Sequence, residues 1–521
     1  MKSAVFLSNV LPAVALAARQ DAVFTNPVVY SDFADNDVSL GPDGAYYFSA
    51  SNMHYSPGAP ILRSLDLVNW ELIGHSVPAL DFGDGYDLVG GQAYRGGTWA
   101  SSMRYRESTG LWYWVGCVNF WETYIYTAEK PEGPWSRASV LPGGTCYYDC
   151  GLLIDDDDTM YVVHGATDVR MAQLSEDGLS EVRSEDLFSA SDIGLDGIEG
   201  NRLYKKDGLY YILNDHPGTS TYIWKSESPW GPYESKVLVD NVASPVEGGG
   251  TPHQGSLIRA TTGDWYYMSF TWAYPAGRMP VLAPIEWGPD GFPVLVTDDS
   301  GAWGASYPMP HDAQPLANWT GTDTFAGAAL GPHWEWNHNP DETKYAVGDD
   351  GLTLSTATVT DDLYAARNTL THRTYGEFPN GTVEVDFSGM ADGDTFGLAA
   401  FRDRTAFIGV LRDGDTYRLR TVHNLTQDEE TWETVDAGAV ETEAEIFDTR
   451  IWLRASLDAR ASGTREATFS YSFDGEEFTQ FGGAYEMWTN WAYFMGYRFG
   501  IFNFATKELG GSIRVLSFTN T

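Results

Sequence analysis

Short runs of alternating apolar and polar residues, separated by turns rich in Gly and Asp, fill the first 300 residues of the chain. In the clearest run, a strand begins at Glu199, a turn follows at residues 206–208, and an aromatic strand covers residues 209–213. Asp-Gly between alternating apolar residues is a strong β-hairpin signal. Glu199 lies between Gly197 and Gly200. A carboxylate with so little side-chain cover is expected where a ligand approaches.

The same unit occurs five times along the chain. In each copy a leading residue precedes an aromatic strand by 10 to 12 positions, and successive leading residues are 50 to 64 positions apart. The leading residues are Asp35, Trp99, Asp149, Glu199 and His253. Strand pairs repeated at this period indicate a β-propeller, here with five blades. Because the innermost strand of each blade lines the central channel, the five leading residues should converge at one end of it.

A second pattern of short alternating strands begins at Asp323, after a Pro- and Asn-containing stretch at 309–322 that is typical of a linker. The expected strands are 352–355, 382–387, 395–401, 407–411, 417–422, 451–457, 467–473 and 498–504. Many short strands with polar turns indicate a β-sandwich of jelly-roll type. The prediction is therefore an all-β protein with a propeller at 21–308, a linker at 309–322 and a sandwich at 323–521.

Residues 1–20 resemble a secretory signal, with an early Lys2, an apolar stretch and Ala15-Leu-Ala17 as a cleavage site. Three N-glycosylation sequons begin at Asn318, Asn380 and Asn424. Together these features predict a secreted, extracellular glycoprotein.

The net charge is −40 and the isoelectric point is about 4.4. Such an acidic chain argues against nucleic-acid or anionic-membrane partners and fits a soluble protein that acts on a neutral substrate. No apolar span of 18 residues follows the N-terminal stretch. We expect a monomer.

Three cysteines are present, Cys117, Cys146 and Cys150. The odd number leaves at least one free or intermolecular. Any one pair could form a disulfide, and the sequence does not choose among them.

Three of the five leading residues are acids, a pattern that suits glycosidic bond hydrolysis. That reaction needs a protonated carboxylic acid and an ionised carboxylate on either side of the bond. Asp35, Asp149 and Glu199 could supply the base, a modulator and the acid. Turn or capping acids are the alternative in a chain with 72 acidic residues. Their equivalent place in the repeat favours function. Residues 155–158 lie at a hairpin turn and read as solvated acids rather than a calcium loop.

Three other residues near the predicted channel end are candidates for binding. Trp99 is either an apolar platform for a sugar face or a core tryptophan. His253 is a residue type that is usually structural, but among acids it could hold a metal ion or water. Arg278 could hold a sugar hydroxyl or the acid pair. We expect no catalytic cofactor, and a structural calcium or sodium ion bound through waters with His253 nearby.

Several motifs match those of one known family. They are Asn26-Pro-Val-Val-Tyr30 before Asp35-Asn-Asp-Val38, Tyr148-Asp149 before Gly151-Leu-Leu-Ile-Asp155, Glu199-Gly-Asn-Arg-Leu-Tyr204, His253-Gln-Gly255 and Gly277-Arg278. On these motifs the chain resembles glycoside hydrolase family 43.

The resemblance implies a role for each matching residue. It implies Asp35 as general base, Asp149 as pKa modulator and Glu199 as general acid. It also implies His253 as the metal-site histidine and Arg278 as a substrate-holding arginine. Residues 51–62 are similar to a family stretch near the sugar pocket, so His54 is a candidate contact. Asn36 departs from the family, which commonly has a proline there.

Within the family, residues 33–38, 58–64 and 145–150 are most similar to fungal arabinoxylan arabinofuranohydrolases that act on doubly substituted xylose. This resemblance implies a secreted, inverting α-L-arabinofuranosidase. It would release O-3 linked arabinose from arabinoxylan or its oligosaccharides. Tyr148, or its neighbour Tyr147, could contact the neighbouring sugar or could be an ordinary strand aromatic. A β-xylosidase with the same acids and a sugar-binding propeller without catalysis are the alternatives.

Overall fold

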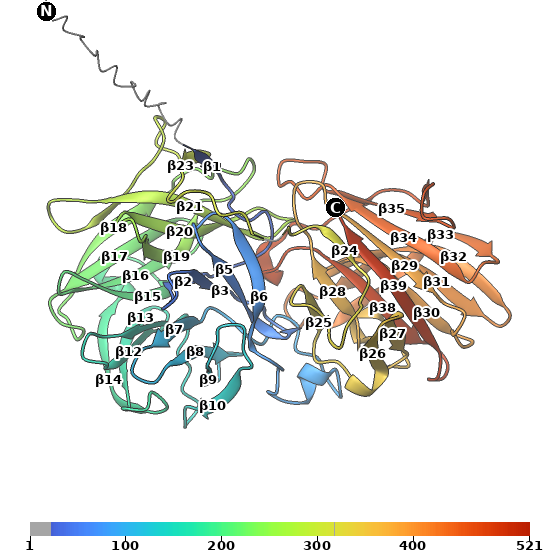
Figure 1. Cartoon of the computed structure of the whole chain (residues 1–521), viewed down its shortest axis with the longest axis horizontal. Helices are drawn as coiled ribbons and strands as arrows, with labels where there is room; N and C mark the ends of the chain where they lie inside the picture. The colour runs from blue at the N-terminus through green and yellow to red at the C-terminus, as the bar shows by residue number, and fades with distance from the viewer. Residues whose placement is uncertain (1–21, 317) are drawn as a thin grey trace, which may run out of the picture.

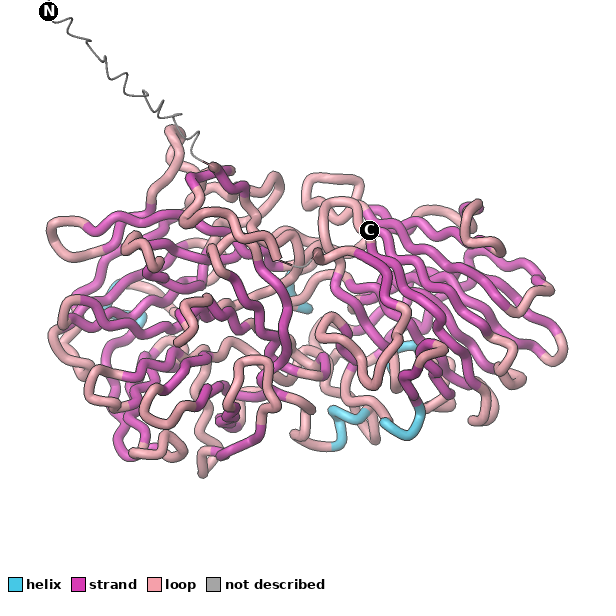
Figure 2. Tube along the Cα trace, viewed as in Figure 1, coloured by secondary structure: helices cyan, strands magenta, loops and turns pink. Residues whose placement is uncertain are grey.

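A computed structural model describes residues 22–316 and 318–521, so the predicted signal segment lies outside the described residues. The chain forms two β domains side by side, one coloured from blue to yellow and the other from orange to red (Figure 1). Strands dominate both, and helical structure is confined to short 3-10 turns (Figure 2). The predicted all-β class, a five-bladed propeller followed by a β-sandwich, is confirmed.

Five four-stranded antiparallel sheets form the propeller. The blades are β2 (Asp37–Leu40), β3 (Tyr46–Ser49), β5 (Gly58–Ser64) and β6 (Trp70–Val77); β7 (Ser102–Arg106), β8 (Leu111–Val118), β9 (Glu122–Ala128) and β10 (Ser136–Val140); β11 (Gly151–Ile154), β12 (Met160–His164), β13 (Asp168–Leu174) and β14 (Glu181–Ser189); β15 (Glu199–Lys206), β16 (Leu209–His216), β17 (Ser220–Ser226) and β18 (Glu234–Asp240); and β19 (His253–Arg259), β20 (Trp265–Trp272), β21 (Arg278–Trp287) and β22 (Pro293–Leu295). The first strand of each blade contacts the first strand of both neighbouring blades, which closes a ring around the channel.

Strands in the middle of the blades are more buried than the outermost strands of the second and third blades. The middle strands, such as β8 and β16, are buried over most of their length, whereas the outermost β10 and β14 are largely exposed. Aromatic runs occupy the middle strands because a strand covered on both faces needs apolar residues in succession. The short β1 (Val23–Thr25) pairs with β23 (Ser306–Pro308) and ties the two ends of the propeller together.

The sandwich contains two large antiparallel sheets. The sheet nearer the propeller is built from β25 (Trp334–Asn337), β28 (Leu370–Arg373), β38 (Arg498–Ala505), β30 (Asp394–Phe401), β31 (Arg404–Asp413), β32 (Thr416–Gln427) and β33 (Thr434–Ile446). The other is built from β24 (Gly321–Asp323), β26 (Tyr345–Gly348), β27 (Gly351–Ser355), β39 (Ser512–Asn520), β29 (Asn380–Asp386), β34 (Arg450–Leu457), β35 (Glu466–Ser472), β36 (Thr479–Gln480) and β37 (Tyr485–Glu486).

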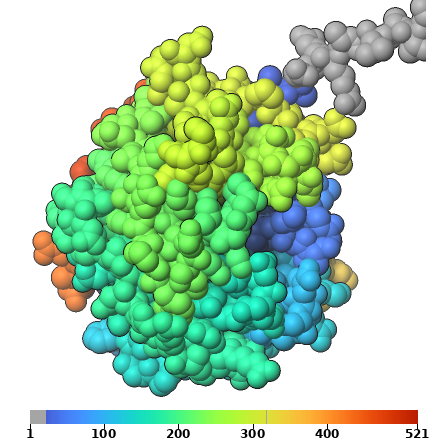
Figure 3. Space-filling model, turned by 90° about the vertical axis from the view of Figure 1, so that its left-hand side faces the viewer, coloured from blue at the N-terminus to red at the C-terminus, as the bar shows by residue number. Residues whose placement is uncertain are grey.

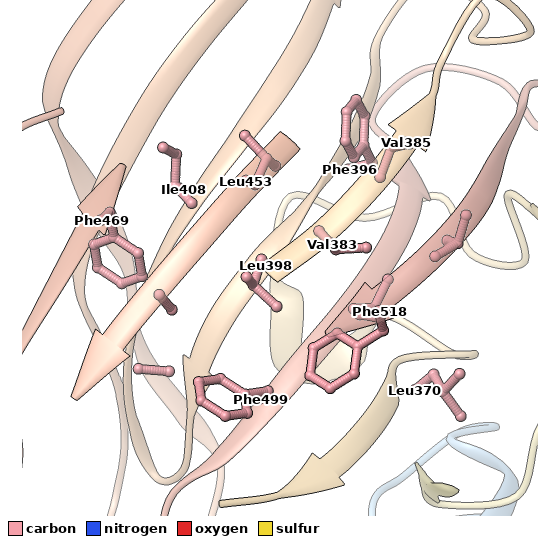
Figure 4. Packing of buried hydrophobic residues seen from close by; sticks show 14 of the residues in the cluster. Leu370, Val383, Val385, Phe396, Leu398, Ile408, Leu453, Phe469, Phe499 and Phe518 are labelled. Carbon is pink, nitrogen blue, oxygen red and sulfur yellow. The ribbon is translucent and has the colours of Figure 1, made fainter. Parts of the chain in front are cut away.

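Inward-facing side chains of the two sheets interdigitate between them (Figure 4). Phe396, Leu398 and Ile408 come from the sheet nearer the propeller, and Val383 and Leu453 come from the other. All five are fully buried. Burying a side chain of this size contributes about 1.5–3 kcal/mol, so this layer accounts for much of the stability of the sandwich.

The two domains share a strand and a buried ion network. The two-residue β4 (Tyr55–Ser56), an excursion from the first blade, pairs with β25 and so extends the sandwich sheet into the propeller. Beside it, Glu335 contacts Arg373, Arg498 and His75. Burial opposes ionisation of Glu335, but the two guanidinium groups hold its pKa well below the usual range. These contacts fix the sandwich against the propeller rim.

Cys117 and Cys146 form a disulfide with a Cα–Cα distance of 5.1 Å, and Cys150 is a buried free thiol. The bond joins the end of β8 to the loop that precedes Asp149. Across residues 22–316 and 318–521, no helix has the length and apolar character needed to span a bilayer.

Candidate active site

Left-handed backbone marks the beginning of several inner strands. The φ angle is +58° at Asp35, +46° at Asp149, +71° at Gly200 and +48° at Gln254. Only glycine adopts such angles without strain, and strained residues persist where the surroundings fix them. Four blades therefore place a left-handed residue at or beside the predicted leading position, and in three of them it lies at or next to Asp35, Asp149 or Glu199.

Asp35 is held by a cation and a hydroxyl group. Its Oδ1 accepts a hydrogen bond from Arg278 Nη1 at 2.9 Å, and its Oδ2 accepts one from Ser51 Oγ at 2.6 Å. Both Asp35 and Arg278 are buried. The charge-assisted bond pairs the Asp35 carboxyl group with a cation and orients it, as a general base requires.

Asp149 and Glu199 lie in a different electrostatic setting. Asp149 Oδ2 accepts from the Gly200 N–H at 3.0 Å and from Gln254 Nε2 at 3.3 Å, and no cation pairs with either carboxyl group among the described residues. Burial and the neighbouring carboxylates of Glu199 and Asp35 raise the pKa of Asp149 well above its usual value. Burial also raises the pKa of Glu199, and Asp35 adds to the rise, although the Tyr148 hydroxyl, which donates to Glu199 Oε2 at 2.8 Å, opposes it. Buried carboxyl groups this close retain a proton, as a general acid must.

A fourth carboxyl group, Asp215, faces the same place and was not predicted. Asp215 pairs with Glu199 across the β15–β16 hairpin. A bulge between Glu199 and Arg202 shifts this pairing by one residue, so counting back from the Asp207-Gly208 turn would have placed His216 opposite Glu199. Asp215 is fully buried, and its oxygens have no hydrogen-bond partner. Burial and the charges of Glu199 and Asp149 raise its pKa well above the usual value.

Arg202 joins the backbones that carry these acids. This fully buried guanidinium donates to the carbonyl oxygens of Asp35 at 2.7 Å and Cys150 at 2.8 Å. It therefore links the strand that begins after Asp35 to the one that begins after Asp149. Arg202 was not predicted as a site residue, because an arginine inside a strand pattern carries no signal of this kind.

One wall of the site comes from the sandwich. Phe494 lies between two guanidinium groups, with Arg95 and Arg278 each 4.4 Å from its ring centroid. In the same segment, the half-exposed Trp491 stacks on Trp272 of the fifth blade at 5.6 Å. A segment more than 200 residues beyond the last propeller motif, at Arg278, thus completes the site.

A second aromatic group lines the propeller side. Trp99 contacts Phe120 at 4.6 Å and Phe494 at 5.2 Å, and Phe120 stacks on Tyr148 at 5.6 Å. Trp99 is only 8% exposed, so Phe120, at 49%, offers more apolar surface for a sugar face. Tyr148, partly exposed, joins this wall to the acid through its bond to Glu199.

The structure places His54 behind this wall rather than on its surface. The side chain is fully buried, Nδ1 accepts the Arg95 backbone N–H at 3.1 Å, and Nε2 lies 3.4 Å from the Tyr493 hydroxyl. Burial lowers its pKa well below the usual value, so the ring is neutral. A buried ring with both nitrogens engaged has no surface for a sugar. The resemblance alone does not show this, because it marks proximity to the pocket and not exposure.

His253 lies against aromatic rings near Arg278. Its Nδ1 is 2.8 Å from the Thr251 carbonyl oxygen, and its ring contacts Phe270 and Trp272, each at 4.9 Å. Burial lowers its pKa to about 4, so the ring is neutral and Nε2 keeps its lone pair. Within the described ranges, no group of three or more His, Cys, Asp or Glu side chains could hold a metal ion. His253 would thus offer a cation one imidazole nitrogen.

Two large hollows lie away from the acids. A cavity of about 910 Å³ lies between the two domains, near His75, Trp336 and Pro340. Another, of about 710 Å³, opens at the opposite mouth of the channel, among the far ends of the five inner strands. Figure 3 shows the propeller from the side turned away from the sandwich. Neither hollow is lined by Asp35, Asp149 or Glu199.

Comparison with known families agrees with this geometry. The sequence profile described as glycosyl hydrolases family 43 matches residues 24–293, which is the propeller. The chain belongs to glycosyl hydrolase family 43. A second profile, the beta xylosidase C-terminal concanavalin A-like domain, matches residues 322–519.

Relatives in this family differ in the activities their names state. A beta-xylosidase of Formosa agariphila is 27% identical over 96% of this chain and 90% of its own length. A non-reducing end alpha-L-arabinofuranosidase of Bacteroides ovatus is 30% identical over 61% of each chain. A solved family-43 structure is 43% identical, covers 96% of this chain and all of its own, and has a TM-score of 0.92. It comes from active-site engineering that generated both endo-xylanase and exo-arabinofuranosidase activity.

For a family-43 hydrolase, the two sides of the site have complementary chemistry. Asp35, held by Arg278 and Ser51, can take a proton from water, and the Glu199 group can give a proton to a leaving oxygen. Ser51 donates its hydrogen bond to Asp35, and the free thiol of Cys150 is buried.

Proposed function

We propose that the chain is a secreted, inverting α-L-arabinofuranosidase that releases arabinose side chains from arabinoxylan. We further propose that it prefers O-3 linked arabinose on doubly substituted xylose. The observation that carries the chemistry is the contrast between Asp35, paired with Arg278, and the pair of Asp149 and Glu199, which form no ion pair among the described residues and whose pKa values are raised.

In this mechanism Asp35 activates a water molecule on one side of the sugar, and Glu199 protonates the glycosidic oxygen on the other. The water adds to the anomeric carbon as the bond to the leaving oxygen breaks, and the configuration inverts. Burial and the closeness of Asp149 to Glu199 favour a retained proton on this pair, and that proton is available to the leaving oxygen. Arg278 holds Asp35 in place while Phe494 and Phe120 enclose the sugar.

The substrate proposal is supported by similarity and by the shape of the rim. The 43% identical structure, whose description includes exo-arabinofuranosidase activity, covers all but a small part of the chain. The aromatic walls come from both domains, and ligand sites commonly lie between domains. Tyr148, whose hydroxyl bonds to Glu199, is placed to sense a neighbouring sugar.

A β-xylosidase is the second candidate, because most of the curated relatives compared carry that name, including one that matches 96% of the chain. The three acids would act alike on either sugar. A non-catalytic sugar-binding propeller is the remaining alternative. The raised pKa of Glu199 beside an ion-paired Asp35 disfavours it, since binding alone needs no proton donor.

Paired aryl glycosides and defined oligosaccharides test the proposal. We expect faster turnover of 4-nitrophenyl α-L-arabinofuranoside than of 4-nitrophenyl β-D-xyloside. Arabinose release from doubly substituted xylose should be faster than from singly substituted xylose. Preference for the xyloside would support the β-xylosidase instead. No turnover of either would support a binding protein. Proton NMR of the first product should show inverted configuration.

Export, glycosylation and ion binding are further parts of the proposal. Asn318 and Asn424 are exposed, as glycan acceptors need to be. Expression in a secreting eukaryotic host should give a monomeric extracellular protein whose mass falls on glycosidase treatment. A calcium or sodium ion near His253 would be detected by elemental analysis, and His253→Ala should lower its occupancy.

A further inference from the structure

We propose that Arg95 is a substrate-binding residue at the rim of the site and that its guanidinium takes the carboxylate of a uronic acid on the polysaccharide. This inference rests on the proposed function, because it assumes a branched xylan-type substrate. It adds an acidic substituent next to the cleaved side chain as a feature that the enzyme recognises.

The surroundings of Arg95 combine rings from both domains. Its guanidinium lies 4.4 Å from the Phe494 centroid, 5.8 Å from that of Trp99 and 5.7 Å from that of Trp432. The Arg278 guanidinium lies at the same distance from the Phe494 centroid. The Phe494 ring therefore contacts both Arg95 and Arg278, and Arg278 in turn pairs with Asp35. Arg95 is partly exposed, whereas Trp432 is only 6% exposed. The guanidinium is therefore stacked in place at the edge of the site and remains reachable.

Arg95 lacks the counter-charge that the other site arginines have. Arg278 pairs with Asp35, and Arg202 Nε lies 3.6 Å from Asp37 Oδ1. Among the described residues, no carboxylate pairs with Arg95, and its buried Nε has no hydrogen-bond partner. In a chain with 72 acidic and 32 basic residues, an unpaired, partly buried arginine stands out.

Arg95 is held in a strained, left-handed backbone conformation. Its φ is +63°, and that of the contacting Phe494 is +68°. The Arg95 N–H donates to His54 Nδ1, and this bond fixes the strained residue from behind. Strain of this kind is retained where structure serves a binding role. It also gives His54 a role: it positions Arg95.

The chemistry favours an anion over sugar hydroxyl groups. A planar guanidinium offers parallel N–H groups that match a carboxylate, and only an anion offsets its charge as well as its hydrogen bonds. The flanking rings provide apolar faces against which a pyranose can stack. A hexuronic acid carries both features, a carboxylate and a stacking ring, on one residue.

Matched oligosaccharides test the assignment. Three doubly substituted arabinoxylan oligosaccharides are compared: one neutral, one with a uronic acid on the adjacent xylose, and one with that uronic acid as its methyl ester. For the wild type, kcat/KM should be about tenfold higher on the acid than on the other two, as expected for one charge-assisted contact. In Arg95→Gln this ratio should fall to near one. Arg95→Lys, which keeps the charge but loses the parallel N–H groups of the guanidinium, should give an intermediate ratio.

Arg454→Gln is the matched control, because Arg454 also stacks on a ring, Phe478 at 3.5 Å, but lies on a sandwich strand outside the site. It should keep the wild-type ratio. Equal wild-type rates on all three sugars would overturn the proposal. So would an equal loss on acid and ester in Arg95→Gln, or loss of the ratio in Arg454→Gln.

A binding measurement separates this inference from the proposed function. Calorimetry with Asp35→Ala should give about tenfold tighter binding of the acid than of the ester, and Arg95→Gln in that background should abolish the difference. If the wild type releases no arabinose from any of the three, the proposed function fails, and calorimetry still decides on Arg95. Thermal unfolding of each Arg95 variant shows whether it is folded. If Arg95→Gln does not fold, the lysine variant carries the test.

Discussion

Two sides of one channel end carry the same type of side chain in opposite electrostatic settings. Asp35 accepts hydrogen bonds from a guanidinium and a hydroxyl. Asp149, Glu199 and Asp215 gather on the other side, where no cation pairs with them among the described residues and where burial raises each pKa. The repeat supplies equivalent positions, and the neighbours decide whether a carboxyl group serves as base or acid.

Asp35→Ala removes the base and should cause the largest loss of activity among these variants. Because no other described carboxylate at this end of the channel pairs with Arg278, the rate should fall on the order of 10⁴-fold on aryl and natural substrates alike. Steady-state kinetics measures this loss. Asp156→Asn, at an exposed hairpin turn, is the control and should keep full activity. Retention of more than a tenth of the activity in Asp35→Ala would remove Asp35 from this role.

Arg278→Gln tests what keeps Asp35 on the base side. The substitution leaves a buried carboxylate without its cation, and breaking such a pair costs about 3–5 kcal/mol. We expect kcat/KM to fall by roughly 10²-fold or more. Ser51→Ala removes only the hydroxyl bond to Asp35 and should cost less. A larger loss in Ser51→Ala than in Arg278→Gln would contradict the ion pair as the main determinant.

Tyr148→Phe tests the acid side of the site, where Glu199 lies. The Tyr148 hydroxyl stabilises the ionised form of Glu199 and so lowers its pKa. Without it the pKa rises further, the proton is kept to higher pH, and the alkaline limb of the pH–rate profile should move upward. The change in rate at the optimum should be about tenfold or less, since one neutral hydrogen bond is lost. An alkaline limb that moves downward would show that Tyr148 instead stabilises the protonated acid.

Asp215→Asn should act on stability, with a dependence on pH. The folded pKa of Asp215 lies well above its unfolded value of about 3.9. Between these values the folded state keeps a proton that the unfolded state releases, so the wild type loses stability as pH rises through this window. The asparagine variant does not titrate and should be more stable than the wild type by about 1–3 kcal/mol at pH 7, with little difference near pH 4. Urea unfolding at the two pH values measures this. An equal difference at both would contradict a raised pKa.

The sequence predicts the fold well because its signals are local and repeated. Asp-Gly turns and aromatic runs locate the hairpins, and the period of about 50 residues gives the five blades. Eight sandwich strands also lie where the alternation predicts them, within a few residues. The pattern misses β25, β28 and β39. It also misses β33, a largely exposed 13-residue strand, because its polar sequence carries no apolar alternation.

The site is predicted in part, for a related reason. Asp35, Asp149 and Glu199 share a repeat position, so their convergence can be anticipated. Phe494 and Arg95 come from segments without that period and meet only through docking of the sandwich. Asp215 needs the bulge at Gly200, which no residue count reveals. His54 shows the limit of a resemblance, because burial depends on contacts with Tyr493 and Arg95.

The division between base and acid is tested most directly by the leaving-group dependence of Glu199→Ala. Rates are compared with wild type on an arabinoxylan oligosaccharide and on a 4-nitrophenyl arabinofuranoside, whose leaving group needs little protonation. If Glu199 is the acid, the variant should lose about 10²–10⁴-fold on the oligosaccharide and far less on the aryl glycoside. Equal losses on both substrates would contradict the assignment of Glu199 as the proton donor.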